Sequence, residues 1–249
     1  MNYPGLRCQW ITVMCSLAQR RDMLNGVRWL ALEVKYLDRT VAFYEAFLNL
    51  EVRREDEREV ALSVGESSLV LREPGDVPRG GLHTHYALSI PAAEYDQWYD
   101  RLSESFDLVE HTFGDARSLY FYDPDGNCVE LGQRAVSGPG VDGIFEIVLE
   151  VEQLDRALSF YEALGFEVTD RGDERKRVRL TTGEFDLELW EPQLGLADAR
   201  GGVHVDFGVS TDAPEQTVEK VRDQTRGVES LPNGVRVRDP DGHYLSLVS

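Results

Sequence analysis

Leu37-Asp-Arg-Thr-Val-Ala-Phe-Tyr-Glu-Ala46 returns, little changed, as Leu154-Asp-Arg-Ala-Leu-Ser-Phe-Tyr-Glu-Ala163. Three shorter segments recur in the same order and at nearly the same offset. They are Glu73-Pro74 with Glu191-Pro192, Arg79-Gly-Gly81 with Arg200-Gly-Gly202, and Asp123-Pro-Asp-Gly126 with Asp239-Pro-Asp-Gly242. Self-similarity at a fixed period indicates a duplicated unit. The sequence therefore predicts an N-terminal arm over residues 1–26 and two copies of one domain, residues 27–133 and 143–249.

Each copy divides again into two units with the same pattern. In the first copy, residues 29–34 alternate as a strand, residues 38–48 have helical spacing, and short strand-like runs follow. The same order starts again at residue 85, and both halves recur in the second copy. One such unit has an apolar sheet face and open edges, so it must pair with another. We expect an α+β fold of tandem β-α-β-β-β units, four in all, forming two half-barrel cups.

Charge is the most unusual feature of the composition. The 249 residues include 45 acidic and 26 basic side chains, for a net charge of −19. Only Lys35, Lys176 and Lys220 are lysines, which leaves 26 − 3 = 23 arginines. This evenly acidic, lysine-poor composition resembles that of haloarchaeal proteins and suits a halophilic cytoplasm. It argues against nucleic acid and anionic membranes as partners.

Other features of the composition also favour a cytoplasmic location. No run of residues is apolar for the length of a membrane span. The apolar residues 9–18 precede Arg20 and Arg21, which is the reverse of the order in a secretory leader. The three cysteines form no CxxC pair, so we expect neither disulfides nor a thiolate metal site, and Cys128 is expected to be a buried thiol.

The repeat, the LDRxxxFYE helix and the DPDG turn before the last strand together resemble the vicinal-oxygen-chelate superfamily, which includes glyoxalases, bleomycin-resistance proteins and extradiol dioxygenases. The resemblance covers essentially all residues after 26. It implies a cup that holds one divalent metal ion between the first and last strands of two paired units. A set of one imidazole and three carboxylates there would suit Fe(II), Zn, Ni, Co or Mn. Carried over by position, the resemblance points to Trp29 and Val70 in the first unit, His85 and Glu130 in the second, Glu146 and Glu188 in the third, and His204 and Ser246 in the fourth.

Two pairings of the units are open. Pairing within each copy would divide the polar positions between two incomplete sets. Pairing the second unit with the third would collect His85, Glu130, Glu146 and Glu188 in one cup, and we favour it because that set is complete. A strand glutamate on so acidic a chain is, taken alone, more often a solvated surface residue.

The register of the first ligand is a further open point. An ungapped match of the Arg-Gly-Gly segments aligns His83 with His204 and His85 with Asp206. Alternation places His83 and His85 on one strand face, so either could be the ligand. The segment His85-Tyr-Ala-Leu-Ser-Ile90 looks more like the ligand strand of the family, which favours His85.

Residues 109–111 and 119–130 fit the signature of extradiol dioxygenases. That resemblance implies that Tyr120 hydrogen-bonds a bound catecholate, that His111 lies near the substrate, and that Glu130 binds iron. Our first hypothesis is therefore a ring-cleaving dioxygenase acting on a small molecule. A phenol could stabilise the developing oxyanion, although an aromatic at Tyr120 also suits an ordinary amphipathic strand.

One departure from that signature favours an alternative. The dioxygenases use two histidines and one carboxylate, whereas this chain has Glu146 at the second histidine position. Its set is more similar to that of glyoxalase I, a lyase that acts through a metal-bound enediolate, with Glu146 and Glu188 as candidate bases. No basic cluster is clearly placed to bind glutathione, although Arg72, Arg79, Arg117 and Arg200 are candidates.

A third class is a non-catalytic binder of small molecules, as in resistance proteins that keep the cup and lose the metal. The four retained polar positions count against it. The sequence leaves open whether the protein forms a homodimer.

Overall fold

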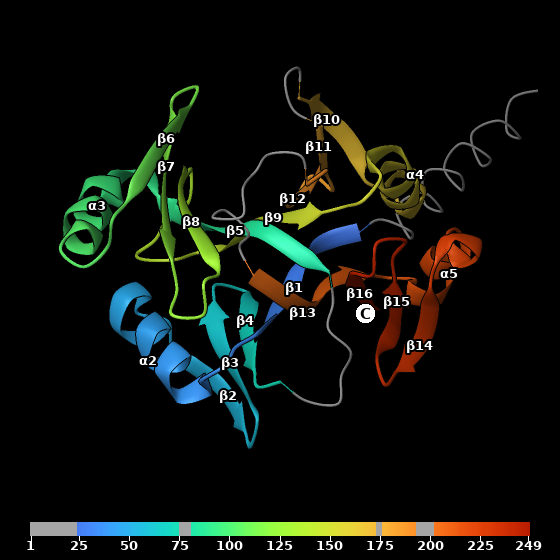
Figure 1. Ribbon diagram of the computed structural model, residues 1–249, viewed down its shortest axis with the longest axis horizontal. Helices are drawn as coiled ribbons and strands as arrows, with labels where there is room; N and C mark the ends of the chain where they lie inside the picture. Colours follow the sequence, from blue (N-terminus) through green and yellow to red (C-terminus); the bar gives the residue numbers. More distant parts are fainter. Residues whose placement is uncertain (1–23, 75–80, 173–175, 193–201) are drawn as a thin grey trace, which may run out of the picture.

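The computed structural model describes residues 24–74, 81–172, 176–192 and 202–249, without the side chains of 202–205. Four β-α-β-β-β units follow one another along the chain, as the sequence predicts (Figure 1). The first unit comprises β1 (Leu24–Glu33), α2 (Leu37–Leu48), β2 (Val52–Asp56), β3 (Glu59–Val64) and β4 (Ser67–Arg72). The second comprises β5 (Leu82–Pro91), the 3₁₀ turn η1 (Ala92–Glu94), α3 (Tyr95–Ser103), β6 (Val109–Phe113), β7 (Ala116–Tyr122) and β8 (Cys128–Arg134).

The second half repeats this order. The third unit comprises β9 (Gly143–Glu150), α4 (Leu154–Leu164), β10 (Glu167–Arg171), β11 (Arg177–Thr181) and β12 (Asp186–Trp190). The fourth comprises β13 (Gly202–Thr211), α5 (Pro214–Glu219), η3 (Arg222–Gln224), β14 (Gly227–Leu231), β15 (Gly234–Arg238) and β16 (Tyr244–Val248). Most of the predicted arm, residues 1–23, lies outside the described residues, and β1 begins at Leu24.

The units pair across the two copies. Strand β5 of the second unit runs antiparallel to β9 of the third, and β1 of the first runs antiparallel to β13 of the fourth. Within each unit the first strand pairs in parallel with the last. The result is two curved half-barrel cups, one from the middle two units and one from the outer two. The pairing favoured from the sequence is the one observed.

Helix-to-turn contacts join the two units of each copy, although those units do not share a cup. The Tyr44 hydroxyl on α2 donates to the Asp123 carboxylate at 2.8 Å, and the Tyr161 hydroxyl on α4 donates to Asp239 at 2.9 Å. Both acceptors are buried first residues of a DPDG turn, and Gly126 in the first turn has a φ of 87°. Glycine adopts that conformation without the steric cost that other residues pay. The LDRxxxFYE helix and the DPDG turn therefore recur together because, in each copy, a tyrosine of the helix donates a hydrogen bond to the first aspartate of the turn.

A β-bulge changes the expected direction of one histidine. His85 lies opposite Val148, yet His83 lies opposite the next residue, Leu149, so one residue of β5 is extra. Such a bulge breaks the alternation of side chains. His83 therefore faces the helix side, with its ring centroid 6.1 Å from that of Tyr86. The prediction that His83 and His85 share a strand face was wrong.

The same irregularity occurs in the fourth unit. Ala31 lies opposite Asp206 and Leu32 opposite His204, just as Val148 and Leu149 lie opposite His85 and His83. Asp206 is therefore the counterpart of His85. The family-based placement of His204 at that position is wrong, and the ungapped Arg-Gly-Gly alignment is correct there.

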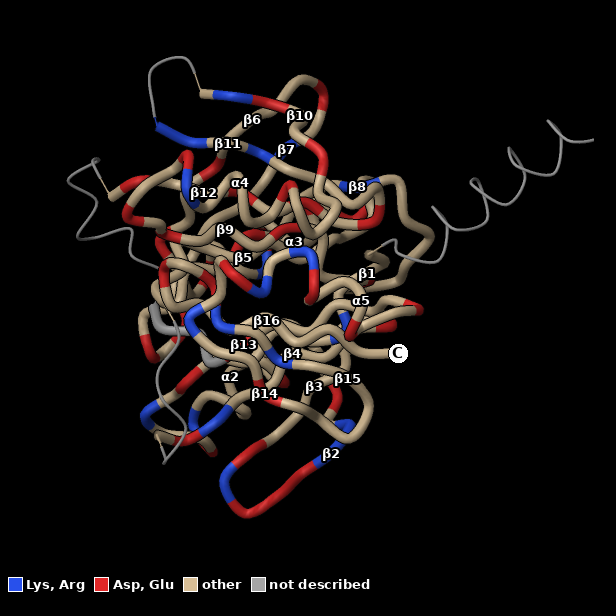
Figure 2. Tube along the Cα trace, turned by 90° about the vertical axis from the view of Figure 1, so that its right-hand side faces the viewer, with Lys and Arg blue, Asp and Glu red and all other residues tan. Residues whose placement is uncertain are grey.

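Acidic residues are distributed over the described chain rather than gathered in one segment (Figure 2). Among the described residues, no helix is both long and apolar enough to span a membrane. The interior is a shared apolar core that includes Leu30, Tyr86, Ile147 and Phe207, one from the first strand of each unit. The first strands are thus buried between the helices on one side and the cups on the other, which holds their cup-facing side chains in place.

Candidate metal centre

Three predicted ligands meet in the cup of the middle units. The Nε2 atom of His85 on β5 lies 3.2 Å from Glu130 Oε2 on β8 and 3.3 Å from Glu146 Oε1 on β9. One ligand atom from each lies within 4.8 Å of the others, and all three residues are buried. Two ligand atoms on one ion, with bonds of about 2.0–2.2 Å, lie about 3.0–3.5 Å apart. The spacing therefore fits a single divalent cation.

The donor set supports the same interpretation. Glu146 Oε2 is buried and forms an ion pair with Arg179, but it accepts no aligned hydrogen bond from the part of the chain that the structure describes. A buried carboxylate oxygen without an aligned donor is costly, and a metal ion bound to it would offset that cost. One imidazole with two carboxylates suits a borderline-to-hard divalent ion. His85, Glu130 and Glu146 would hold it.

Without a metal, the charges of Glu130 and Glu146 favour the protonated form of the His85 imidazole. Burial alone would lower the pKa of His85, but the hydrogen bonds and charges of Glu130 and Glu146 outweigh it and raise the pKa to about 10. Burial by itself would raise the pKa of Glu130, yet the bond to His85 and its charge lower it. The metal-free cup therefore holds an imidazolium ion between two carboxylates at neutral pH.

This charge state predicts proton release on metal binding. A metal ligand must be a neutral imidazole, so at pH 8 each bound ion is expected to displace about one proton from His85. Since the metal-free His85 is protonated below its pKa of about 10, apparent affinity should rise about tenfold per pH unit up to that value. Calorimetric titrations in buffers of different ionisation enthalpy measure the released proton directly. Release of less than about a tenth of a proton at pH 8, as for an ordinary histidine, would contradict this charge state.

Glu188 lies beside this group rather than within it. It extends from β12 into the same cup, accepts a hydrogen bond from Trp190 Nε1 at 2.6 Å, and accepts another from Arg177 at 3.2 Å. Burial and the charge of Glu146 raise the pKa of Glu188. Of the four predicted metal ligands, three converge, and the fourth is a buried carboxylate that shares the Arg179 guanidinium with Glu146.

The predicted dioxygenase residues also lie in this cup. The Tyr120 hydroxyl on β7 donates to Glu130 Oε2 at 2.7 Å, and its ring centroid is 5.5 Å from that of His85. The exposed His111 on β6 stacks edge-on against Tyr120 at 5.4 Å. Burial and the Glu130 charge raise the pKa of Tyr120, so it remains a neutral hydrogen-bond donor.

Cys128 is a buried thiol, as expected from the sequence. Burial first, and then the charge of Glu130, raise its pKa to about 12. At neutral pH it is therefore protonated and a poor nucleophile.

Sequence reasoning missed the arginines of the cup. Arg177 and Arg179 on β11 lie beside Glu188, and Arg134 at the end of β8 stacks 3.5 Å over the Phe145 ring. The alternation Arg177-Val-Arg179, opposite a strand with Asp186 and Glu188, is the signal that could have found two of them. Of the arginines proposed instead, Arg72 lies in the other cup, Arg117 bonds Asp96 at the surface, and Arg79 and Arg200 lie outside the described residues.

The outer cup has a different centre. The fully buried carboxylate of Asp206 accepts hydrogen bonds from Trp29 Nε1 at 2.6 Å and from Ser246 at 3.2 Å, and ion pairs with Arg236 and Arg72. The Trp29 ring lies against Gly208, where a Cβ atom would come within 2.5 Å of it. An ionic cluster and an indole thus fill the positions that hold His85, Glu130 and Glu146 in the middle cup.

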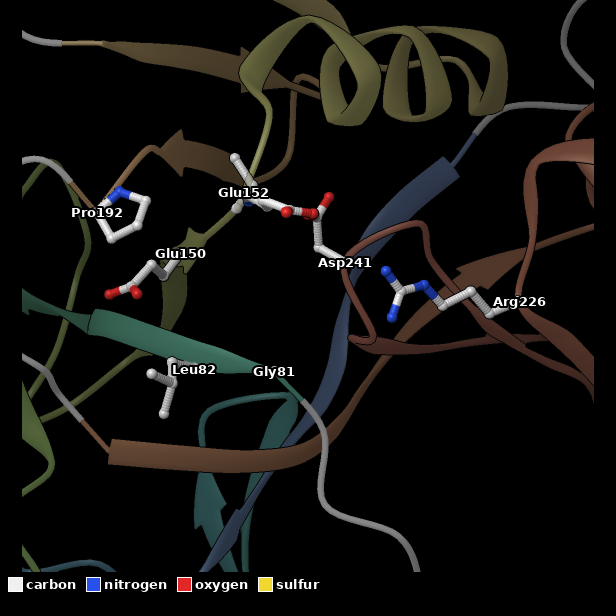
Figure 3. Close-up of a pocket in the computed structure, with 8 residues that line it drawn as sticks. Gly81, Leu82, Glu150, Glu152, Pro192, Arg226 and Asp241 are labelled. Carbon is white, nitrogen blue, oxygen red and sulfur yellow. The ribbon is translucent and has the colours of Figure 1, made fainter.

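A cleft of about 480 Å³ lies outside the His85 cluster. Glu150, Glu152, Asp241 and Arg226 are among its lining residues, and Figure 3 shows the Arg226 side chain extending toward Asp241. Asp241 already accepts hydrogen bonds from Arg156 and from the Glu152 backbone. The residues that line this cleft do not include His85, Glu130 or Glu146.

A family model described as the glyoxalase, bleomycin resistance protein and dioxygenase superfamily matches residues 26–131 and 143–247. The chain belongs to this superfamily. Members of the vicinal-oxygen-chelate superfamily use divalent metals and include enzymes, and the His85, Glu130 and Glu146 group is one that could bind such an ion.

Two curated relatives and two solved structures illustrate the relationship. The metallothiol transferase FosB of Staphylococcus saprophyticus is 28% identical over 116 residues, which is 44% of this chain and 77% of the relative. A lactoylglutathione lyase of Arabidopsis thaliana is 32% identical over 148 residues, 51% of each chain. Glyoxalase I from Zea mays matches with a TM-score of 0.69 at 20% identity, covering 90% of this chain and 92% of that one. A Bacillus subtilis protein provisionally named a dioxygenase also has a TM-score of 0.69, at 16% identity, covering 91% and 85%. These two likenesses show the fold alone.

Proposed function

We propose that the middle cup is the active site of a metal-dependent lyase of the glyoxalase I kind. Its substrate would be a small molecule with two neighbouring oxygens, such as the hemithioacetal of a 2-oxoaldehyde. The observation that carries the proposal is the carboxylate-rich donor set, in which one imidazole and two carboxylates converge and a third buried carboxylate, Glu188, lies beside them. Both curated relatives have names that refer to thiol chemistry, which supports a thiol adduct as substrate.

The metal would polarise the substrate oxygens and make the adjacent C–H bond more acidic. Glu188 would then take the proton from one carbon and return it to the neighbouring carbon, so that the reaction is an isomerisation and needs no other reactant. Trp190 and Arg177 hold the Glu188 carboxylate through hydrogen bonds and so orient it. Tyr120 would hold Glu130 in place through its hydroxyl.

The test is turnover of methylglyoxal adducts with several small thiols, in D2O, by metal-loaded protein. A product with solvent deuterium at the new C–H bond supports proton transfer by an exchanging base. Glu188→Gln should retain the metal and lose about 100-fold or more in kcat, because a positioned base contributes at least that much. The exposed Glu184→Gln, in the hairpin before β12, serves as the matched control.

Two results would overturn the role of Glu188. Full activity of Glu188→Gln would exclude it as the base. Loss of the metal together with activity would make it a fourth ligand instead, as the family resemblance implies.

Tyr120 and His111 favour ring cleavage as a second candidate function. Tyr120 lies against His85 and His111 lies against Tyr120, so the two rings could contact a catechol bound in the cup. Iron in the isolated protein and a yellow ring-fission product from catechol would establish this reaction. Zinc, nickel or cobalt with hemithioacetal turnover would exclude it.

From the composition alone, we propose in addition that the acidic surface is an adaptation to a halophilic cytoplasm. The measurement is stability against salt: a protein of net charge −19 should gain stability as molar KCl screens its self-repulsion.

A further inference from the structure

The Arg179 guanidinium contacts three carboxylates of the middle cup, those of Glu146, Asp186 and Glu188. Its Nε lies 2.9 Å and its Nη2 2.7 Å from Asp186 Oδ2. Nη2 also contacts Glu146 Oε2, and Nη1 lies 3.6 Å from Glu188 Oε1. The guanidinium therefore touches a proposed metal ligand, the proposed base and a carboxylate that has neither role.

The contact with Glu146 is electrostatic rather than a well-formed hydrogen bond. Glu146 Oε2 has no hydrogen-bond partner among the described residues even though Arg179 lies against it. In contrast, Asp186 binds the same guanidinium through two nitrogens. Arg179 is thus held at Asp186 by a hydrogen bond and an ion pair, and at Glu146 by an ion pair without an aligned hydrogen bond. About 29% of its side chain is exposed, so it can turn without leaving the cup.

We propose that Arg179 holds the place of the cation in the metal-free cup and becomes the anchor for an anionic group of the substrate once metal is bound. A divalent ion on Glu130 and Glu146 would bring two positive charges and remove the attraction between Glu146 and Arg179. Tethered to Asp186, the guanidinium would then face the cup with free N–H donors. A carboxylate or phosphate pairs with such a fork better than a neutral group does.

This inference rests on the proposed metal-binding function and names a substrate class for it. The substrate would bear a negative group close to its two chelating oxygens. Arg177 and Arg134 add positive charge to the same cup, although Arg177 is paired with Asp170 and Glu188.

The first experiment titrates zinc or nickel into metal-free protein, without any substrate. Arg179→Met should bind the metal about tenfold more tightly than the natural chain, because no guanidinium has to be displaced. Metal-free Arg179→Met should also melt at a lower temperature, since its carboxylates lose a counter-charge. Arg117→Met, which removes an arginine bound to the surface Asp96, is the control and should change neither value.

The second experiment compares dihydroxyacetone phosphate with dihydroxyacetone as ligands of the metal-loaded protein. Both have adjacent carbonyl and hydroxyl oxygens, and only the first is anionic. The natural chain should bind the phosphate at least tenfold more tightly, Arg179→Lys should keep part of this preference, and Arg179→Met should lose it.

The proposal gives Arg179 two roles: a placeholder for the cation in the metal-free cup, and an anchor for the substrate in the metal-loaded cup. Each role can fail separately from the enzymatic proposal, because neither experiment measures turnover. Unchanged metal affinity in both Arg179 variants would overturn the placeholder role. A phosphate preference that survives in Arg179→Met would overturn the anchor role. Arg179→Lys keeps both tests available if the methionine variant does not fold.

Discussion

Exchanging Glu146 for glutamine is expected to weaken divalent-metal binding by roughly 1000-fold or more. Loss of residues that only support a ligand already costs about 10–100-fold in metal affinity, and loss of a charged ligand costs more. Glutamine keeps the shape of the side chain but removes the negative charge that lies 3.3 Å from His85. A competition titration against a chromophoric chelator measures the change.

The pKa of His85 provides a second measurement that needs no metal. Glu130 and Glu146 together raise this pKa to about 10, so removing one of the two charges should lower it. NMR titration of the His85 ring in metal-free Glu146→Gln would show the decrease. Glu55→Gln, at an exposed position of β2, should alter neither the metal affinity nor the His85 pKa. If Glu146→Gln bound metal as well as the natural chain, the ion would have to bind elsewhere.

The repeat predicted the fold, and the family resemblance predicted much of the candidate site. Because each unit begins and ends with a strand in the sheet centre, the positions of His85, Glu130 and Glu146 follow once the pairing of units is known. The pairing itself was inferred from polarity: only the middle two units offer a full set of ligand-type side chains. The domain boundaries at residues 27–133 and 143–249 remain predictions, and each cup combines one unit from each of those copies.

Two features could not be read from the sequence. The bulge that turns His83 away from His85 adds a residue without any glycine or proline to mark it, so the alternation rule failed there. The arginines were missed because a long flexible side chain can be assigned to a partner only when its surroundings are known. Arg179 and Glu188 are cross-strand partners, and that relation depends on the hairpin register.

Replacing Asp206 with alanine is expected to destabilise the protein by about 3 kcal/mol, more than any surface ion pair could account for. The carboxylate is fully buried and is the common partner of Trp29, Ser246, Arg72 and Arg236. Removing the shared partner of a buried ionic cluster costs roughly 3–5 kcal/mol. Here Arg72 would keep its ion pair with Glu59, and Arg236 would keep its ion pair with Glu229. The two arginine side chains are 22% and 18% exposed, so water can partly compensate, which places the expected value at the lower end.

Urea unfolding of the metal-free protein measures this loss, and two further variants define its origin. Asp206→Asn should lose less than Asp206→Ala, because the amide can still accept the hydrogen bond from Trp29. Asp96→Ala, which breaks an ion pair on a side chain that is 82% exposed, should cost at most about 0.5 kcal/mol. A loss below about 1 kcal/mol for Asp206→Ala would mean that the outer cup does not depend on its ionic centre. Because Asp206 is the counterpart of His85 in a different cup, the same variant should bind metal with unchanged affinity, which separates the two centres that the duplicated fold has produced.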